Sequence, residues 1–335
     1  MADRSDQHIF IPRRRLRGGH AQTLAGNFLP RTNALPRGEQ RIFKVHDGRL
    51  KEDVAVLCEC HWQPERHTVM TVVIVHGLEG STESQYVIGT GSKAWLAGMN
   101  VVRMNMRNCG GTEKLTPTLY HSGMSGDIDA VLTALIEDEA LERVAVVGYS
   151  MGGNLSLKLA GEYGENPPPQ LRAVAAVSPA MDLAASADAL HKWSNRVYEI
   201  RFLLNLKRRF RRKAQLFPGR YDLQFLKRCS TIREFDHEIT ARYEGFASAD
   251  DYYSRSSASR VLEHVTVPTL IIHSADDPFI RVLPETRAKL AANPHITFVQ
   301  TQHGGHCAFL ADANGYDGRW AERLVIEFIQ QHCQA

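Results

Sequence analysis

The sequence predicts an α/β fold in which a mostly parallel central sheet carries helices on both faces. From residue 70 onward, short runs of β-branched and other apolar residues alternate with longer amphipathic stretches. Strands that are apolar on both faces and alternate with helical segments are typical of a buried parallel sheet. The runs expected to form strands are Thr71–Val75, Val101–Met106, Val144–Val147, Val174–Val177, Thr269–Ile272 and Ile296–Val299.

Three segments are expected around this alternation. Residues 1–39 are basic and rich in turn residues, and we expect an N-terminal extension that wraps over the domain. Residues 40–180 and 263–335 should form the core, which begins with a hairpin around Asp47-Gly48. Residues 181–262 interrupt the alternation between two sheet strands, and so long a break indicates an inserted cap, here called the cap segment.

Composition excludes several classes of protein. The 335 residues are 43% hydrophobic and 23% charged, as in ordinary globular domains. A net charge of +3 is too mild to predict a nucleic-acid partner. The first ten residues lack the apolar run of a secretory signal, and no stretch reaches the ~18 apolar residues of a membrane span, so we expect a cytoplasmic location. The six cysteines form no CxxC pair, so neither a metal nor a disulfide is expected.

A Gly-x-Ser-x-Gly sequence identifies the candidate nucleophile. Gly148-Tyr149-Ser150-Met151-Gly152 follows an apolar run and leads into a segment that opens a helix. In that context the sequence is typical of a nucleophile elbow, a strained turn that lifts the serine hydroxyl clear of the sheet. Its glycines are required because a Cβ there would collide with neighbouring backbone. The alternative is a phosphate-binding turn, but the glycine patterns of nucleotide-binding loops are absent here.

A serine hydroxyl needs a base, and we expect that base in the loop after the last strand. His306 follows Gly304-Gly305, and two glycines allow this loop to approach the active centre closely. His303 lies three residues earlier and is the alternative. The Gly-Gly-His placement favours His306.

The histidine in turn needs a carboxylate that fixes its tautomer. Asp276 and Asp277 follow the expected strand Thr269–Ile272, at the carboxyl end where open α/β sheets place their sites. Pro278 disfavours helical backbone at the residue before it, which keeps Asp277 extended at the strand exit. We therefore predict Asp277 as the acid, with Asp276 as the alternative.

The oxyanion that forms on the acyl group needs hydrogen-bond donors. His76-Gly77-Leu78-Glu79-Gly80 closes the strand Thr71–Val75, where such folds place one backbone donor. Leu78 is the candidate there, and Met151, next to the nucleophile, is the second. Each donor is worth about 3 kcal/mol. We interpret His76 as a buried side chain that braces the loop.

The whole chain resembles the YheT-like, embryogenesis-associated subgroup of the α/β-hydrolases. Beyond the elbow, the resemblance rests on Gly19–Leu24, His76–Gly80, Asn105–Gly111, Tyr120–Gly123, Phe235-Asp236, Asp251–Tyr253 and Gly304–His306. It implies an esterase or lipase that uses the Ser150, Asp277 and His306 triad without a metal or other cofactor. One departure is Arg107-Asn108, where many relatives carry Arg-Gly. We also expect no counterpart of the membrane anchor that some eukaryotic relatives carry.

These observations predict a serine carboxylic-ester hydrolase, either a short- or medium-chain carboxylesterase or an acylglycerol lipase, that forms an acyl-serine intermediate. An acyltransferase or thioesterase on the same triad is the alternative within enzymes. A non-enzymatic binding protein would have no use for a complete triad. We interpret the basic run Lys207–Lys213 as a solvated helix face, with weak contact to an anionic lipid surface as its alternative.

Overall fold

The structure is a computed structural model that describes residues 9–333, so residues 1–8 of the expected N-terminal extension lie outside the described range. Eight strands form one sheet in the order β1-β2-β4-β3-β5-β6-β7-β8. The strands are β1 Glu39–Asp47, β2 Glu52–His61, β3 Thr71–Val75, β4 Asn100–Met104, β5 Val144–Tyr149, β6 Leu171–Val177, β7 Thr269–Ser274 and β8 Ile296–Thr301.

The sheet is mostly parallel, as predicted. Strands β3 to β8 run parallel to one another, whereas β2 pairs in the antiparallel sense with both β1 and β4. The expected hairpin is present, but Asp47 pairs with Glu52 across a turn of four residues rather than two. All six apolar runs named above form strands, which confirms the α/β-hydrolase fold class.

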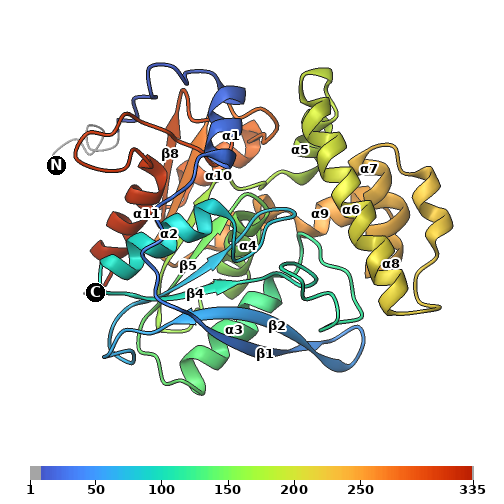
Figure 1. The fold of residues 1–335 in the computed structure, drawn as a ribbon, viewed down its shortest axis with the longest axis horizontal. Coiled ribbons are helices and arrows are strands. Elements are labelled where there is room, and N and C mark those ends of the chain that lie inside the picture. The colour runs from blue at the N-terminus through green and yellow to red at the C-terminus, as the bar shows by residue number, and fades with distance from the viewer. Residues whose placement is uncertain (1–8, 334–335) are drawn as a thin grey trace.

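Helices cover both faces of the sheet (Figure 1). The α-helices of the described residues, those of the cap segment included, are α1 Gly19–Phe28, α2 Gln85–Leu96, α3 Ser125–Glu137, α4 Met151–Tyr163, α5 Leu183–Leu190, α6 Arg196–Leu216, α7 Ile232–Phe235, α8 Arg242–Glu244, α9 Ala249–Ser256, α10 Pro284–Ala292 and α11 Trp320–Gln331.

Alternation along the strands explains the two helical layers. Successive strand side chains point to opposite faces. Val72 and Ile74 of β3 pack in one apolar cluster with α2 and α11, while Val73 and Val75 pack in a second cluster with α3 and α4. Both layers bury apolar surface, so the central strands must be apolar throughout, which is the pattern that the sequence displays.

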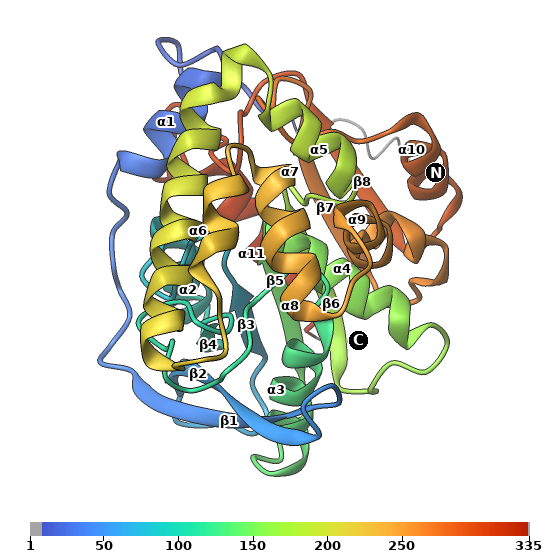
Figure 2. The same ribbon diagram turned by 90° about the vertical axis from the view of Figure 1, so that its right-hand side faces the viewer.

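The cap segment contributes helices α5 to α9, which leave the sheet between β6 and β7 (Figure 1). In Figure 2 the side that carries the cap segment faces the viewer, and α6 and α7 lie in front of the sheet. The segment also contains a π-helical turn, Asp236–Ala241, between α7 and α8. The division of the chain into a core and a cap remains our interpretation.

The N-terminal residues contain more regular structure than expected. We anticipated an irregular extension, but Gly19–Phe28 forms the ten-residue helix α1. Gln22 is fully buried, and its side chain donates to the Leu310 carbonyl while it accepts from the Leu310 amide. These bonds attach α1 to the segment that follows β8.

Candidate active site

Ser150 occupies a strained turn between β5 and α4. Its backbone has φ 54° and ψ −114°, a region that residues with a Cβ rarely adopt. The close approaches expected around the turn are present. A Cβ on Gly148 would lie 2.2 Å from the Gly152 carbonyl oxygen, and one on Gly152 would lie 2.4 Å from the His76 carbonyl oxygen. The glycines thus allow the turn to pass between neighbouring strands.

The structure brings the three predicted triad residues together. His306 Nε2 lies 2.9 Å from Ser150 Oγ, and His306 Nδ1 lies 2.8 Å from Asp277 Oδ2. The other carboxylate oxygen, Asp277 Oδ1, accepts from the amides of Phe279 and Ile280 at 3.1 and 2.9 Å. Asp277 is therefore held on both oxygens, and it fixes the orientation of the imidazole.

The two alternative residues form a separate pair. His303 Nδ1 lies 3.2 Å from Asp276 Oδ2, and the His303 side chain is about half exposed. Asp276 Oδ1 accepts from the Gly305 amide at 2.9 Å. Asp276 thus holds the loop that carries His306. It is His306, and not His303, that contacts Ser150.

Electrostatics favour a charged form of the His306–Asp277 pair. Burial opposes the charged imidazole, but Cys307 and Asp277 outweigh it and raise the pKa of His306. Burial would raise the pKa of Asp277, but the facing His306 lowers it below its ordinary value. The carboxylate thus stays ionised, and the site stabilises an imidazolium when His306 takes a proton.

The loop after β3 presents the Leu78 backbone amide beside Ser150, whereas the amides on either side of Leu78 have partners. The Gly77 amide donates to Tyr86 Oη at 2.9 Å, and the Glu79 amide faces Tyr120 Oη at 3.3 Å. Among the described residues, the amides of Leu78 and Met151 make no backbone hydrogen bond outside the regular elements. These two predicted oxyanion donors are therefore open to a ligand.

Buried His76 holds this loop in place. Its Nδ1 lies 2.7 Å from the Gly77 carbonyl oxygen, and its Nε2 accepts from the Met106 amide at 3.1 Å. Burial lowers the pKa of His76 to about 4, so the ring is neutral and serves as one donor and one acceptor. This is the bracing role that the sequence suggested.

Our interpretation of the basic run as a solvated face is wrong for two of its members. Arg208, Arg211 and Arg212 are exposed, but Lys213 is buried and donates to the carbonyls of Glu113 and Thr116. Arg209 also faces inward and forms a bidentate ion pair with Glu79 at 3.0 and 3.1 Å. Because α6 is amphipathic, one face of a strongly charged run can still be buried.

The Arg209–Glu79 pair connects the cap segment to the oxyanion loop. Glu79 directly follows Leu78 and adopts a positive φ of 60°. Tyr120 Oη donates to Glu79 Oε1 at 2.5 Å, and the Arg209 guanidinium lies over the Tyr120 ring. Arg209 also donates to the Asn108 carbonyl. Sequence analysis missed this network because Arg209 and Glu79 lie far apart in the chain.

Helix α1 is a second feature whose role the sequence did not reveal. The Thr23 hydroxyl accepts from the His306 amide at 2.8 Å. A Cβ on Gly305 would lie 2.4 Å from the Gly19 carbonyl oxygen, so the helix and the base loop are in close contact. The Gly19–Leu24 sequence thus positions His306, and only its recurrence in relatives could have indicated this.

The departure at Asn108 leaves the local geometry intact. Asn108 has φ 64°, in the left-handed region that glycine adopts without penalty. Asparagine tolerates this region better than most residues. Its side chain donates to the Thr118 carbonyl at 2.9 Å, which fixes the turn.

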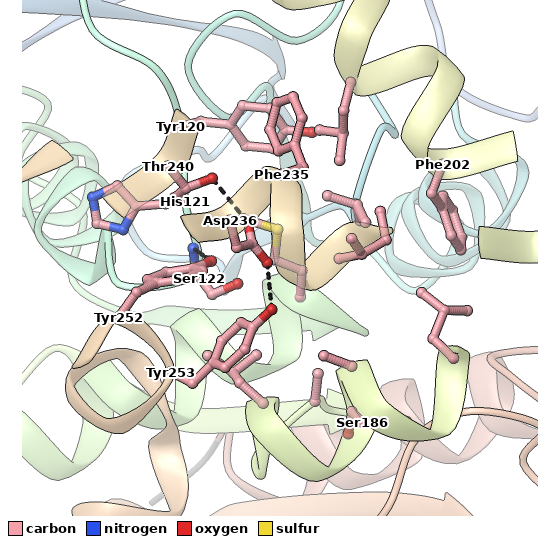
Figure 3. Close-up of a pocket in the computed structure, with 18 of the residues that line it drawn as sticks. Tyr120, His121, Ser122, Ser186, Phe202, Phe235, Asp236, Thr240, Tyr252 and Tyr253 are labelled. Carbon is pink, nitrogen blue, oxygen red and sulfur yellow. Dashed lines mark hydrogen bonds between the residues drawn. The ribbon is translucent and has the colours of Figure 1, made fainter. Parts of the chain in front are cut away.

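Two cavities meet at Ser150. The first has a volume of ≈ 140 Å³ and is lined mainly by apolar side chains of α5, α6, α7 and α9, including Leu183, Leu206 and Phe235 (Figure 3). The second, of ≈ 300 Å³, lies between α1, the oxyanion loop and α6, and it includes Asn27 and Arg201. The nucleophile therefore separates an apolar cavity from a more polar one.

Residues 9–333 contain no group of three or more His, Cys, Asp or Glu side chains arranged to hold a metal ion. Their cysteines are all free. No helix within this range is long and apolar enough to cross a membrane.

Comparison with known proteins identifies several similar chains. A family model described as "alpha/beta hydrolase fold" matches residues 71–313. The chain is 33% identical to "Putative esterase YheT" of Escherichia coli (strain K12), over 97% of this chain and 94% of that protein. It is 28% identical to "Phospholipase ABHD3" of Bos taurus, over 78% of this chain and 63% of that protein.

Among solved structures, 2,6-dihydroxy-pseudo-oxynicotine hydrolase superposes with a TM-score of 0.60 at 17% identity. The superposition covers 94% of this chain and 72% of that one, and it shows a likeness of fold alone.

Proposed function

Because the chain belongs to the α/β-hydrolase family, in its YheT-like group, we propose that it is a serine hydrolase that cleaves carboxylic esters. One observation carries this proposal. Ser150 Oγ, the His306 ring and the Asp277 carboxylate form a continuous hydrogen-bonded series at 2.9 and 2.8 Å, beside two open backbone amides.

The mechanism follows from this geometry. His306 Nε2 removes the proton from Ser150 Oγ as the oxygen attacks the acyl carbonyl. The Leu78 and Met151 amides stabilise the oxyanion, and the Asp277 carboxylate stabilises the imidazolium. His306 then gives its proton to the leaving alcohol. A water molecule, deprotonated by His306, hydrolyses the acyl-serine and regenerates the hydroxyl.

We assign the two halves of the substrate to the two cavities. The apolar cavity suits the acyl chain, and the more polar one suits the alcohol. A cavity of about 150 Å³ accepts benzene, so roughly six carbon atoms would fill the first cavity. This size favours short- and medium-chain esters. Transfer to an acceptor other than water, or cleavage of a thioester, would use the same residues.

Comparison of the wild type with Ser150→Ala tests the proposal. Wild type should hydrolyse p-nitrophenyl esters, and the folded variant should not. Glu162→Gln, at an exposed position of the same helix, leaves the nucleophile in place and controls for damage to α4. Equal hydrolysis by wild type and Ser150→Ala would contradict the proposal.

An exposed apolar surface, formed by α6, the turn before it and α1, favours a lipid ester as the substrate. Trp193, Val197 and Leu204 are 91%, 77% and 56% exposed, and their spacing places them on one face of α6 and the turn before it. Phe28 of α1 is 68% exposed and lies under the Arg201 guanidinium at the second cavity. Exposed apolar side chains with basic neighbours are typical of contact with an anionic lipid surface.

Vesicle sedimentation tests this second candidate function. The wild type should bind vesicles that contain phosphatidylserine, and a Val197→Ser and Leu204→Ser double variant should bind less. Leu96→Ser, which alters an exposed leucine on α2, is the matched control. Failure of the wild type to bind would leave soluble esters as the favoured substrates.

A further inference from the structure

One acidic residue lines the apolar cavity beside Ser150. Asp236 begins the π-helical turn that follows α7, and it faces the cavity together with Thr240 and Tyr253 (Figure 3). π-Helical turns are rare and occur often at functional sites. The triad and the oxyanion donors account for no part of this cluster.

The Asp236 carboxylate is held by neutral groups. Thr240 Oγ1 donates to Oδ1 at 2.8 Å, and Tyr253 Oη donates to Oδ2 at 2.7 Å. The Arg209 guanidinium, which lines the same cavity, is paired with Glu79. Arg233, which lies over the Tyr253 ring, is paired with two other acids, Asp188 and Asp250. Burial raises the pKa of Asp236 to about 6, so the carboxylate is ionised at neutral pH. A buried charge is costly unless it is paired or fully hydrogen-bonded.

A structural role explains only part of this arrangement. The two hydrogen bonds join the π-helical turn to α9, and an uncharged acceptor would be sufficient for that. An ionised carboxylate offers about four acceptor positions, of which Thr240 and Tyr253 use two. The remaining capacity lies in the same cavity as Ser150.

We propose that Asp236 accepts a hydrogen bond from a hydroxyl group on the acyl chain, so that the preferred substrates are esters of hydroxylated, medium-length acids. The inference rests on the proposed function, because the ester carbonyl must lie at Ser150 while the chain fills the cavity. A hydroxyl group fits better than an ammonium group. An ammonium group loses far more hydration free energy than a hydroxyl group when it enters an apolar cavity.

Matched esters test the proposal in the full-length protein. Ethyl hexanoate is compared with ethyl 3-hydroxyhexanoate, ethyl 6-hydroxyhexanoate and ethyl 6-aminohexanoate, and kcat/KM is measured by pH-stat titration at pH 8. The variants are Asp236→Asn, which keeps the size of the side chain, and Asp236→Leu, which removes every acceptor. Asp138→Asn, at an exposed acid that directly follows α3, is the matched control.

Wild type and Asp138→Asn should prefer at least one hydroxylated ester over ethyl hexanoate. The ratio of kcat/KM for the hydroxylated ester to kcat/KM for ethyl hexanoate measures this preference. Because a hydrogen bond to a charged group is lost, Asp236→Leu should lower the ratio about ten- to hundredfold. The ratio for Asp236→Asn should lie between those of wild type and Asp236→Leu. A preference for the amino ester alone would overturn the choice of a hydroxyl ligand.

Two other results separate the possible failures. A wild type that cleaves ethyl hexanoate but disfavours every hydroxylated ester would overturn the inference and leave the proposed function standing, even if no Asp236 variant folds. Hydrolysis of no ester would overturn both.

Discussion

Replacing Arg209 with glutamine is expected to impair catalysis although Arg209 does not contact the reacting atoms. The variant removes the bidentate ion pair to Glu79 and the bond to the Asn108 carbonyl. Glu79 follows Leu78, the proposed oxyanion donor. The loss should therefore loosen one of the two amides that stabilise the oxyanion.

The expected decrease in kcat follows from the contribution of the Leu78 amide to stabilising the oxyanion. Complete loss of one oxyanion donor costs about 3 kcal/mol, or about 10² to 10³ in kcat. The His76 bonds and the Tyr120 hydroxyl still hold the loop in the variant, so we expect only part of that loss. A decrease of about ten- to hundredfold in kcat is the predicted outcome.

The variant should also be less stable. Removal of one partner from a buried ion pair costs about 3–5 kcal/mol. Arg209 keeps some exposure and Glu79 keeps its bond from Tyr120, so the lower end of that range is expected.

The assay is steady-state hydrolysis of p-nitrophenyl acetate, whose small acyl group makes little use of the apolar cavity. The effect should fall on kcat rather than KM, and Arg209→Lys should recover only part of it because lysine cannot form the bidentate pair. Arg211→Gln, at an exposed position of the same helix, is the matched control. Wild-type kcat in a folded Arg209→Gln protein would show that Arg209 does not position the oxyanion loop.

Three further predictions concern the triad and the acyl cavity. Asp277→Asn should lower kcat by about 10⁴, whereas Asp276→Asn should cost far less; reversed effects would mean that the other aspartate is the acid. Only neutral His306 can accept the serine proton, and its pKa is raised, so kcat should increase with pH along a limb centred above 6.5. A limb centred below 6.5 would contradict this assignment. For unsubstituted acyl esters, kcat/KM should rise about fourfold per CH₂ from acetate to roughly C6 and then fall; a flat profile to C16 would exclude the acyl-pocket interpretation.

The parts of this structure that the sequence predicts are those with a local signature. Strands such as β3 and β5 are short and apolar on both faces, so the pattern of burial appears in consecutive residues. Ser150 lies between glycines whose missing Cβ atoms the turn requires. His306 and Asp277 each follow a strand, at the sheet edge where parallel strands bring distant residues together.

The parts that the sequence does not predict depend on contacts between distant segments. Thr23 reaches the His306 amide across most of the chain, and no pattern near either residue indicates this. Arg209 and Lys213 lie in a run whose charge suggested solvent. Phe210, which is buried between them, was the one local sign that α6 presents a face to the core.

Intact-mass analysis after reaction with a fluorophosphonate tests whether Ser150 is the nucleophile. We expect one adduct per chain, located by peptide mapping on Ser150, and no adduct on folded Ser150→Ala. Asp277→Asn should react far more slowly than wild type, because His306 loses its orienting carboxylate. Equal modification of Ser150→Ala, or an adduct on another residue such as Cys307, would contradict the assignment of Ser150 as the nucleophile.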